Sequence, residues 1–384
     1  MLTKGGFQSA MFAKIFKAIK NYLRFSDRAL LALCVITSAF GVFIVYKCTT
    51  YFFGSLSYTY VQLGAAVLGL TLAILISLID YRSMARLWKI HASIAVILVL
   101  LTFFFGLKNQ GADDRAWLQI PFTSLTFQPS ELLKLSFILT FSLHLEKVRD
   151  NINNLFQVAL LCLHGAIPTL LIVMQGDDGS ALVFLCIFVF MLFSANLPWK
   201  FIIPPLAALP AVFYVMWNFV MNADQKARIE VVFNPDAYPL TISVQPRQGK
   251  IALGSGMLFG KGFDANLRKV PAIQSDYIFS FIGETLGFLG CLAVIILLSS
   301  ICFRSLYNAH KSDDLLGKYI CVGVFAMFAA QTVINLGMVL TLLPVIGITL
   351  PLFSAGGTSV VVTFCGIGLV MSVGYHNRHR NRRR

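Results

Sequence analysis

The sequence predicts an all-α integral membrane protein that crosses the bilayer about ten times. Hydrophobic residues make up 57% of the 384 residues, whereas charged residues make up only 12%. This composition lies outside the range of soluble globular domains. Many of the apolar runs also approach the roughly 20 residues that a helix needs to cross a bilayer. The chain is therefore expected to be a polytopic membrane protein.

Ten apolar runs are the predicted spans. In chain order they are Ala29–Tyr46, Tyr60–Ile79, Ile90–Leu107, Leu132–Leu145, Leu155–Met174, Ser180–Ala195, Phe201–Met221, Tyr277–Cys302, Tyr319–Leu342 and Val360–Tyr375. The fourth run is short and contains Lys134 and His144. It could instead be a re-entrant or buried segment, which would leave nine spans and reverse the topology downstream.

Basic residues favour ten spans with both termini in the cytoplasm. In that topology they gather in the N-terminal segment, the inner loops and the C-terminal tail, as the positive-inside rule requires. We expect a cytoplasmic amphipathic segment (1–28), a ten-helix domain (29–375) with a large extracytoplasmic loop between helices 7 and 8 (222–275), and a basic cytoplasmic tail (376–384). Much of the net charge of +14 then faces anionic membrane lipids, so no nucleic-acid partner is expected.

The N-terminal segment is predicted to be an anchor. Its apolar residues alternate with lysine and arginine at helical spacing between residues 12 and 24, which indicates a helix lying in the inner membrane interface. The apolar run that follows is too long for a signal peptide, and no cleavage site of small residues closes it. We expect it to be retained as the first helix.

Several classes of site have no support in the sequence. The eight cysteines fall almost entirely within the spans and lack CxxC spacing, so they are expected to be packing residues. The six histidines form no pattern typical of metal ligands. No Walker loop, dinucleotide fingerprint or Ser-His-Asp grouping is present.

Polar residues gather at the predicted outer ends of the spans. In the cluster Gly111–Lys134, Pro129 and Ser130 would start a helix, and Glu131 would lie in its positive first turn with Lys134 at i+3. A capped helix with a stabilising ion pair is the simpler interpretation. The second cluster, Gln175–Gly179, places two adjacent carboxylates between two spans, where a polar turn would also suffice.

The third and fourth clusters contain glycines and two further acids. The glycines of Gln248–Phe263 would let the backbone approach a ligand closely, or equally a neighbouring helix. In Pro271–Gly287, Asp276 heads a long apolar helix, which it could simply cap, and Glu284 lies about 12 Å deeper. An ionisable residue within a span indicates a functional site by default.

The fifth cluster, Leu343–Ser359, cannot form one continuous helix because it contains two prolines and three glycines. Beside long apolar segments, irregular backbone is tolerated only at a membrane surface or where it lines a cavity enclosed by protein or filled with water. This segment is therefore predicted to shape a site.

Five blocks of sequence together resemble the SEDS family of shape, elongation, division and sporulation proteins, which includes RodA, FtsW and SpoVE. The blocks are FQPSELLK, QGDDGSALV, IALGSGMLFGKGF, QSDYIFSFIGETLGFLG and NLGMVLTLLPVIGITLPLFSAGGTS. The resemblance covers nearly the whole chain and fits a RodA-like member best, with a division or sporulation member as the alternative. It implies a ten-helix peptidoglycan glycosyltransferase of the bacterial cytoplasmic membrane. Such an enzyme polymerises lipid II at the outer face and works with a class B penicillin-binding protein.

The resemblance also implies site residues. The family's essential aspartate matches Asp276, which we expect to be catalytic. The residues expected to bind substrate are Glu131, Lys134, Arg115, Asp177, Lys250, Ser255, Lys261, Glu284, Ser354 and Ser359. The chain departs from the family pattern at Gly176, Ala355 and Thr285, and Ala116 separates Arg115 from Trp117, which weakens the match at Arg115.

The expected chemistry is the attack of an acceptor hydroxyl on an anomeric carbon, with a lipid pyrophosphate leaving. Asp276 would accept the proton, and Lys134, Arg115, Lys250 and Lys261 would hold the pyrophosphate, with a divalent cation left open. One displacement would invert the anomeric centre. A lipid II flippase and a non-catalytic scaffold are the alternatives. The sequence shows no repeated halves of the kind common in transporters, and this favours the enzyme.

Overall fold

A computed structural model describes residues 22, 24, 26–107, 115–123, 125–238 and 240–381. The predicted interfacial helix between residues 12 and 24, apart from residues 22 and 24, and the last residues of the basic tail lie outside the described residues. Among those described, a helix covers each of the ten predicted spans. These helices are α2 (Arg28–Phe53), α3 (Ser57–Leu78), α5 (Trp88–Phe105), α6 (Pro129–Val148), α7 (Leu155–Met174), α8 (Asp178–Ser194), α9 (Trp199–Val215), α12 (Ile278–His310), α13 (Leu315–Val339) and α14 (Gly357–Asn381).

The prediction of an all-α polytopic membrane protein is confirmed. In the described part of the chain, eight helices are long and apolar enough to cross a membrane, and α8 is a shorter apolar helix. The remaining helix, α6, is the span that looked weakest in the sequence. It is continuous over 20 residues, which corresponds to about 30 Å, and most of its residues are buried. A helix surrounded by protein can carry charges that a lipid-facing helix could not.

Shorter elements connect the spans. They are α4 (Tyr81–Arg86), η1 (Arg149–Asn151), the π-helix η2 (Met216–Val220) that continues α9, α10 (Ala223–Phe233), α11 (Val244–Ser255), and the strands β1 (Leu118–Gln119) and β2 (Thr126–Phe127). The strands form a small antiparallel hairpin in which Leu118 pairs with Phe127. The long segment between the seventh and eighth spans therefore contains two helices.

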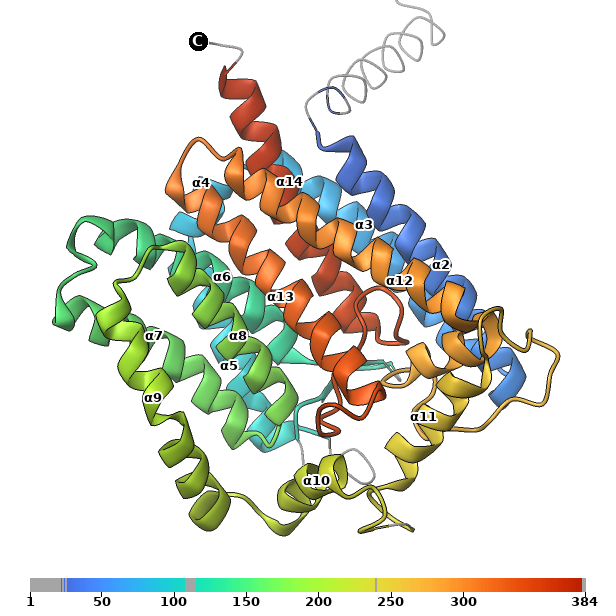
Figure 1. The fold of residues 1–384 in the computed structure, drawn as a ribbon. Coiled ribbons are helices and arrows are strands. Elements are labelled where there is room, and N and C mark those ends of the chain that lie inside the picture. The colour runs from blue at the N-terminus through green and yellow to red at the C-terminus, as the bar shows by residue number, and fades with distance from the viewer. Residues whose placement is uncertain are drawn as a thin grey trace, which may run out of the picture.

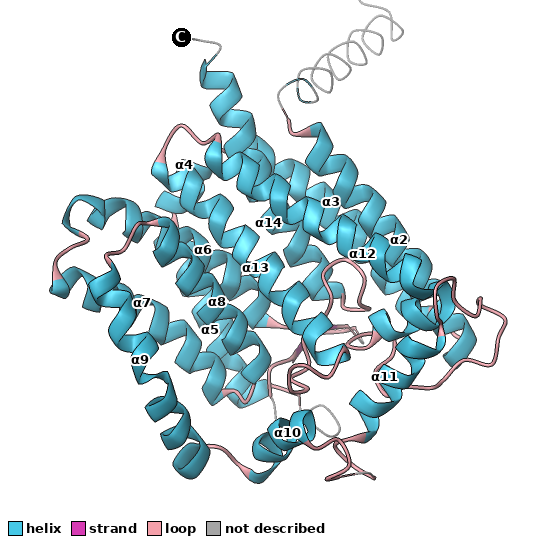
Figure 2. Cartoon of the chain, in the orientation of Figure 1, coloured by secondary structure: helices cyan, strands magenta, loops and turns pink. Residues whose placement is uncertain are grey.

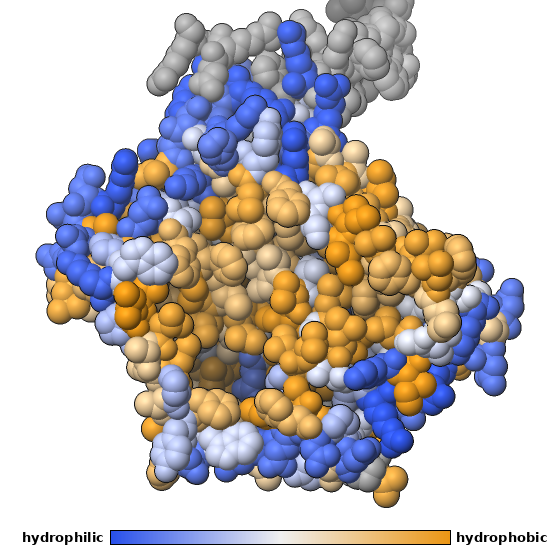
Figure 3. Space-filling view, in the orientation of Figure 1, coloured by the Kyte–Doolittle hydropathy of each residue, from blue (hydrophilic) through white to orange (hydrophobic). Residues whose placement is uncertain are grey.

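The spans run roughly side by side, and the two ends of the bundle differ in what they carry (Figures 1 and 2). The start of α2 and the end of α14 lie at one end. At the opposite end lie α10, α11 and the loops that precede α12 and follow α13. A broad apolar band separates two hydrophilic ends on the face shown in Figure 3. This is the surface expected of a protein whose middle lies in lipid.

The centre of the bundle is α13, which packs against α6, α8, α12 and α14. Helices α3 and α14 form a tightly packed pair. They approach so closely that a Cβ on Gly368 would lie 2.8 Å from the carbonyl oxygen of Ala73. By contrast, α9 has no buried side chain among the described residues and lies at the periphery. The interior helices therefore support the loops at the end of the bundle opposite the start of α2 and the end of α14.

A kink divides α12 at Gly287, whose φ of 68° and ψ of −162° are not helical. The segment 257–262 takes up the backbone groups that the kink leaves free. Four hydrogen bonds do this: the N–H groups of Lys261 and Gly262 donate to the carbonyl oxygens of Glu284 and Thr285, and the N–H groups of Phe288 and Leu289 donate to the carbonyl oxygens of Met257 and Leu258. These hydrogen bonds satisfy backbone donors and acceptors that the kink removes from the helix.

Candidate active site

Asp276 lies in the turn segment 271–277, directly before α12. The simpler interpretation, that it caps this helix, is wrong: Tyr277 holds the N-cap position, and no side chain caps α12. Burial raises the pKa of the Asp276 carboxyl to about 6, although a hydrogen bond with the Ser275 side chain acts in the opposite direction. Among the described residues no ion pair includes Asp276. This carboxyl group is thus a suitable proton acceptor near neutral pH.

The irregular segment between α13 and α14 folds back onto the Asp276 turn. Its backbone from 343 to 356 is not helical, as the sequence predicts. The Ser354 hydroxyl donates to the carbonyl oxygen of Ser275 at 2.6 Å, and the Ala355 N–H donates to that of Gln274 at 2.8 Å. Because its hydroxyl also accepts from the N–H of Leu350 at 2.7 Å, Ser354 holds the two segments together.

The same irregular segment brings the start of α8 to the site. A Cβ on Gly347 would lie 3.8 Å from Asp276 Oδ2, so the glycine faces the carboxylate. On the other side, a Cβ on Gly179 would lie 2.4 Å from the carbonyl oxygen of Ile346, which leaves room only for glycine. Residues 346–347 are therefore sandwiched between α8 and Asp276.

Asp177 links the start of α8 to the start of α6. It caps α8 by accepting from the Ser180 N–H at 2.9 Å, and it also accepts from Gln128 Nε2 at 2.8 Å. Gln128 directly precedes α6. The polar turn proposed as the simpler interpretation is therefore present, and it also joins two of the predicted clusters.

The predicted ion pair of α6 is present and buried. Lys134 Nζ lies 2.6 Å from Glu131 Oε1, and the Lys134 side chain is fully buried. Arg115 has an exposed side chain, while its backbone N–H donates to the carbonyl oxygen of Gln175 at 3.3 Å. Four of the predicted clusters, 111–134, 175–179, 271–287 and 343–359, are therefore joined by contacts at this end of the bundle, although Lys134 is already paired there.

Glu284 forms a second centre with two other predicted residues. Its carboxylate is fully buried and lies 2.7 Å from Lys261 Nζ. It also accepts from Ser255 Oγ at 3.3 Å and from the backbone N–H of Arg268 at 3.0 Å. One carboxylate thus fastens the end of α11 and the following loop to α12, beside the kink at Gly287.

Replacing Glu284 by alanine is expected to lower the free energy of unfolding by about 1–3 kcal/mol, because the partly buried Arg268 N–H loses its acceptor and Lys261 loses its ion-pair partner. Lys261 is partly exposed and can turn towards water, which keeps the cost below that of a fully buried pair. Thermal unfolding in detergent measures the change. Glu230→Ala is the control, since Glu230 accepts only one exposed hydrogen bond, from Tyr238. Equal melting temperatures for the two variants would contradict this role of Glu284.

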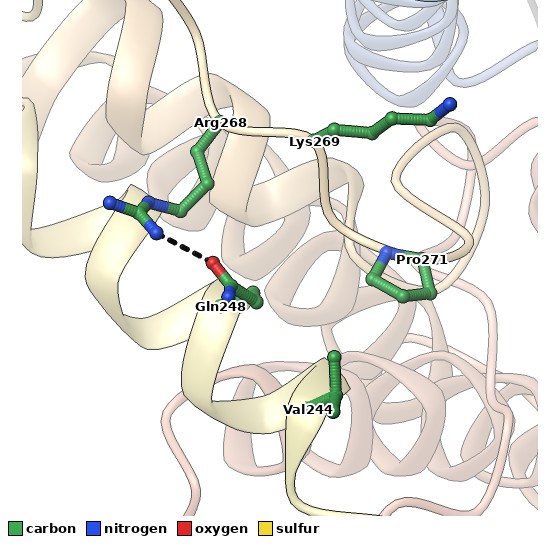
Figure 4. A pocket seen from close by; sticks show the side chains of 5 residues that line it. All are labelled: Val244, Gln248, Arg268, Lys269 and Pro271. Carbon is green, nitrogen blue, oxygen red and sulfur yellow. Dashed lines mark hydrogen bonds between the residues drawn. The ribbon is translucent and has the colours of Figure 1, made fainter. Parts of the chain in front are cut away.

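A basic hollow of about 580 Å³ lies beside α11 and the Asp276 turn segment (Figure 4). Its lining consists of Val244, Gln248, Arg268, Lys269 and Pro271. Arg268 Nη1 donates to Gln248 Oε1 at 2.7 Å, which holds the guanidinium at the edge of the hollow. The predicted Lys250 is exposed on the same helix.

Of the predicted hydroxyl residues, Ser354 lies on the irregular segment and Ser359 lies in the first turn of α14. Ser359 Oγ lies 3.1 Å from Thr349 Oγ1, a hydroxyl of the irregular segment. Sequence reasoning did not identify other residues near the site. The missed residues are Gln128, Arg268, Lys269, Asn335 and Gly347. Gln128, Asn335 and Gly347 lie within the quoted sequence blocks, but their positions depend on contacts between segments far apart in the chain, which the blocks do not reveal. Among the described residues, no group of three or more His, Cys, Asp or Glu side chains could hold a metal ion.

Comparison with known proteins gives one consistent result. The family model FtsW/RodA/SpoVE, described as cell cycle protein, matches residues 27–379. The probable peptidoglycan glycosyltransferase FtsW of Trichlorobacter lovleyi is 29% identical over 363 residues, which cover 90% of this chain and 92% of that protein. The peptidoglycan glycosyltransferase MrdB of Escherichia coli K12 is 29% identical over 323 residues, which cover 83% of this chain and 85% of that protein.

Two solved structures have similar folds. A chain from a structure on the coordination of polymerization and crosslinking by a peptidoglycan synthase complex has a TM-score of 0.78 and 28% identity, covering 92% of this chain and 99% of that one. The rod shape determining protein RodA of Thermus thermophilus has a TM-score of 0.67 and 28% identity, and the match covers 92% of this chain and 98% of that one.

Proposed function

Because the chain belongs to the FtsW/RodA/SpoVE family of cell cycle proteins, we propose that it is a peptidoglycan glycosyltransferase that polymerises lipid II into glycan strands. The observation that carries this proposal is the partly buried carboxyl of Asp276, held where the irregular segment after α13 meets the turn before α12. Both segments lie at the end of the bundle opposite the start of α2 and the end of α14 (Figure 1). With the chain ends in the cytoplasm, the reaction takes place at the outer face of the bacterial cytoplasmic membrane.

In this reaction the acceptor sugar hydroxyl loses its proton to Asp276 as its oxygen attacks the anomeric carbon of the donor. The bond from that carbon to the lipid pyrophosphate breaks, and the pyrophosphate leaves with the electron pair. A single displacement inverts the configuration at the anomeric carbon. A base whose pKa lies close to the working pH is best suited to this transfer.

The leaving pyrophosphate needs positive charge near it. The cations available to bind it are the exposed or partly exposed Arg115, Lys250 and Lys261, joined by Arg268 and Lys269 at the basic hollow. Lys134 and Glu131 neutralise each other inside the protein and support the start of α6 beneath the site. Asp177, Ser354 and Ser359 contribute by holding the loops, and Glu284 and Ser255 by fastening α11 to α12.

The proposed partner is a class B penicillin-binding protein, which would crosslink the strands that this chain makes. One similar chain belongs to a peptidoglycan synthase complex that couples polymerization with crosslinking, which supports a partnership of this kind. The RodA-like blocks of the sequence favour a role in cell elongation. A division or sporulation member would have the same activity with another partner.

The rate of polymerisation is expected to fall as the pH decreases below about 6, because Asp276 must be ionised to accept a proton and burial raises its pKa to about 6. Well below that value the decline approaches roughly tenfold per pH unit. The measurement is the initial rate with saturating lipid II between pH 5 and 8. A rate that stays constant down to pH 5 would contradict the assignment of Asp276 as the base.

Polymerisation itself is tested with the detergent-purified protein, its cognate class B penicillin-binding protein and purified lipid II. Glycan strands resolved by gel electrophoresis are the expected product. The partner alone serves as the control for contaminating activity. Absence of product from the pair, with both proteins folded, would overturn the proposed function.

A further inference from the structure

We infer that Asn335 is a positioning residue for the reaction: its amide fixes the main chain on both sides of the point where the Asp276 carboxylate meets Gly347. This inference rests on the proposed function. Asn335 lies on α13 and is fully buried. Its Nδ2 donates to the carbonyl oxygen of Asp276 at 2.8 Å and to that of Ile348 at 2.7 Å.

These two hydrogen bonds fix the orientation of the amide. If the amide were flipped, its oxygen would face two carbonyl oxygens, which is repulsive, so the nitrogen must point towards them. Asn335 Oδ1 has no hydrogen-bond partner among the described residues. The side chain therefore acts through its two N–H groups.

The two carbonyl groups belong to the two segments that define the site. One is that of residue 276 itself, in the turn before α12. The other belongs to Ile348, the residue after Gly347. A Cβ on Gly347 would lie 3.8 Å from Asp276 Oδ2. Together with the Ser354 and Ala355 hydrogen bonds, the Asn335 side chain thus holds the catalytic carboxylate at a fixed distance from the backbone that faces it, and Asn335 binds the carbonyl group of residue 276 itself.

The amide group is well matched to this task. A hydroxyl side chain offers one donor, and an ionised carboxylate offers none, so neither can bind both carbonyl groups. The side chain also stands on α13, the central helix of the bundle, whose packing limits its movement. Support of a reactive group from a rigid helix is how sites hold their geometry to within a fraction of an ångström.

Asn335→Ala is expected to reduce kcat per folded molecule by roughly 10- to 100-fold, because small misplacements of a reacting group have effects of this size. The KM for lipid II should change by less than about threefold, since Asn335 contacts main chain and no proposed substrate-binding side chain. The decline of the rate at acidic pH should also move to lower pH, because the released turn admits water to Asp276. Asn335→Asp keeps the side-chain shape but offers at most one donor, and should behave similarly.

The matched control is Asn308→Ala at the opposite end of α12. Asn308 is also buried, and its Nδ2 also makes two hydrogen bonds, to Asp27 Oδ2 at 2.7 Å and to the carbonyl oxygen of Arg304 at 3.0 Å. Its loss should lower the melting temperature as much as the loss of Asn335. It should leave kcat per folded molecule and the pH profile unchanged.

The outcomes separate this inference from the proposed function. An inactive wild type would overturn the proposed function and the role of Asn335 in catalysis together. An active wild type with unchanged kcat and pH profile in Asn335→Ala would overturn the inference alone. The same holds if both alanine variants lose activity only in proportion to the folded protein they lose.

Discussion

Asp276→Asn should abolish glycan polymerisation while leaving the protein folded. The amide has the size of the carboxylate but cannot accept the hydroxyl proton, and loss of a general base costs roughly 10²- to 10⁴-fold in rate. Asn335 binds the main-chain carbonyl of residue 276, which the substitution keeps. The measurement is the initial rate of lipid II polymerisation per folded molecule, in complex with the penicillin-binding partner.

The control for this substitution is Asp236→Asn, which makes the same chemical change at an exposed site between α10 and α11. Its rate should stay within about twofold of the wild type, because a surface substitution of this kind disturbs little. An Asp276→Asn protein with more than a tenth of the wild-type rate would show that the carboxylate is not the base.

Gly287→Ala should prevent the protein from folding stably. The φ of 68° and ψ of −162° at this position belong to a region that is essentially restricted to glycine. An added Cβ would also lie 2.3 Å from the backbone nitrogen of Gly260 and 2.6 Å from the carbonyl carbon of Leu258. Relief of that clash would separate segment 257–262 from the kink and break the hydrogen bonds that join them. We expect a loss of more than about 3 kcal/mol.

Gly54→Ala is the matched control, because Gly54 also has a positive φ, 59°, but nothing lies within 4 Å of its Cβ position. It follows α2 as a C-cap in the left-handed region, where alanine costs only about 1–2 kcal/mol. The measurements are the yield of monodisperse protein and its melting temperature. If the two variants gave equal yields and melting temperatures, the kink would not have the structural role described.

The positions of the spans were predictable because length and apolarity alone specify a membrane helix. The residues at which the helices end were less predictable. Helix α2 continues beyond the predicted Tyr46 to Phe53, and α12 continues beyond Cys302 to His310, since polar residues near the interface extend a helix without changing the apolar run. Helix α6 looked weak because the sequence does not reveal that Lys134 and Glu131 pair inside the bundle.

The candidate site was predictable in part. Asp276 and the irregular segment after α13 stood out because an acid at the head of a span and clustered glycine and proline are locally visible. Asn335 was not, because a single asparagine within a helix acquires its role only through two carbonyl groups from distant segments. The kink at Gly287 was also hidden, since it depends on the loop 257–262 that fills it.

The most direct test of the central claim is a single experiment in liposomes that contain lipid II, the protein and its penicillin-binding partner, in which polymerised glycan and translocated lipid II are both measured. The wild type should make glycan strands and Asp276→Ala should make none, with no lipid II translocation by either. Translocation without polymer, lost in Asp276→Ala, would contradict the account and identify a lipid II transporter.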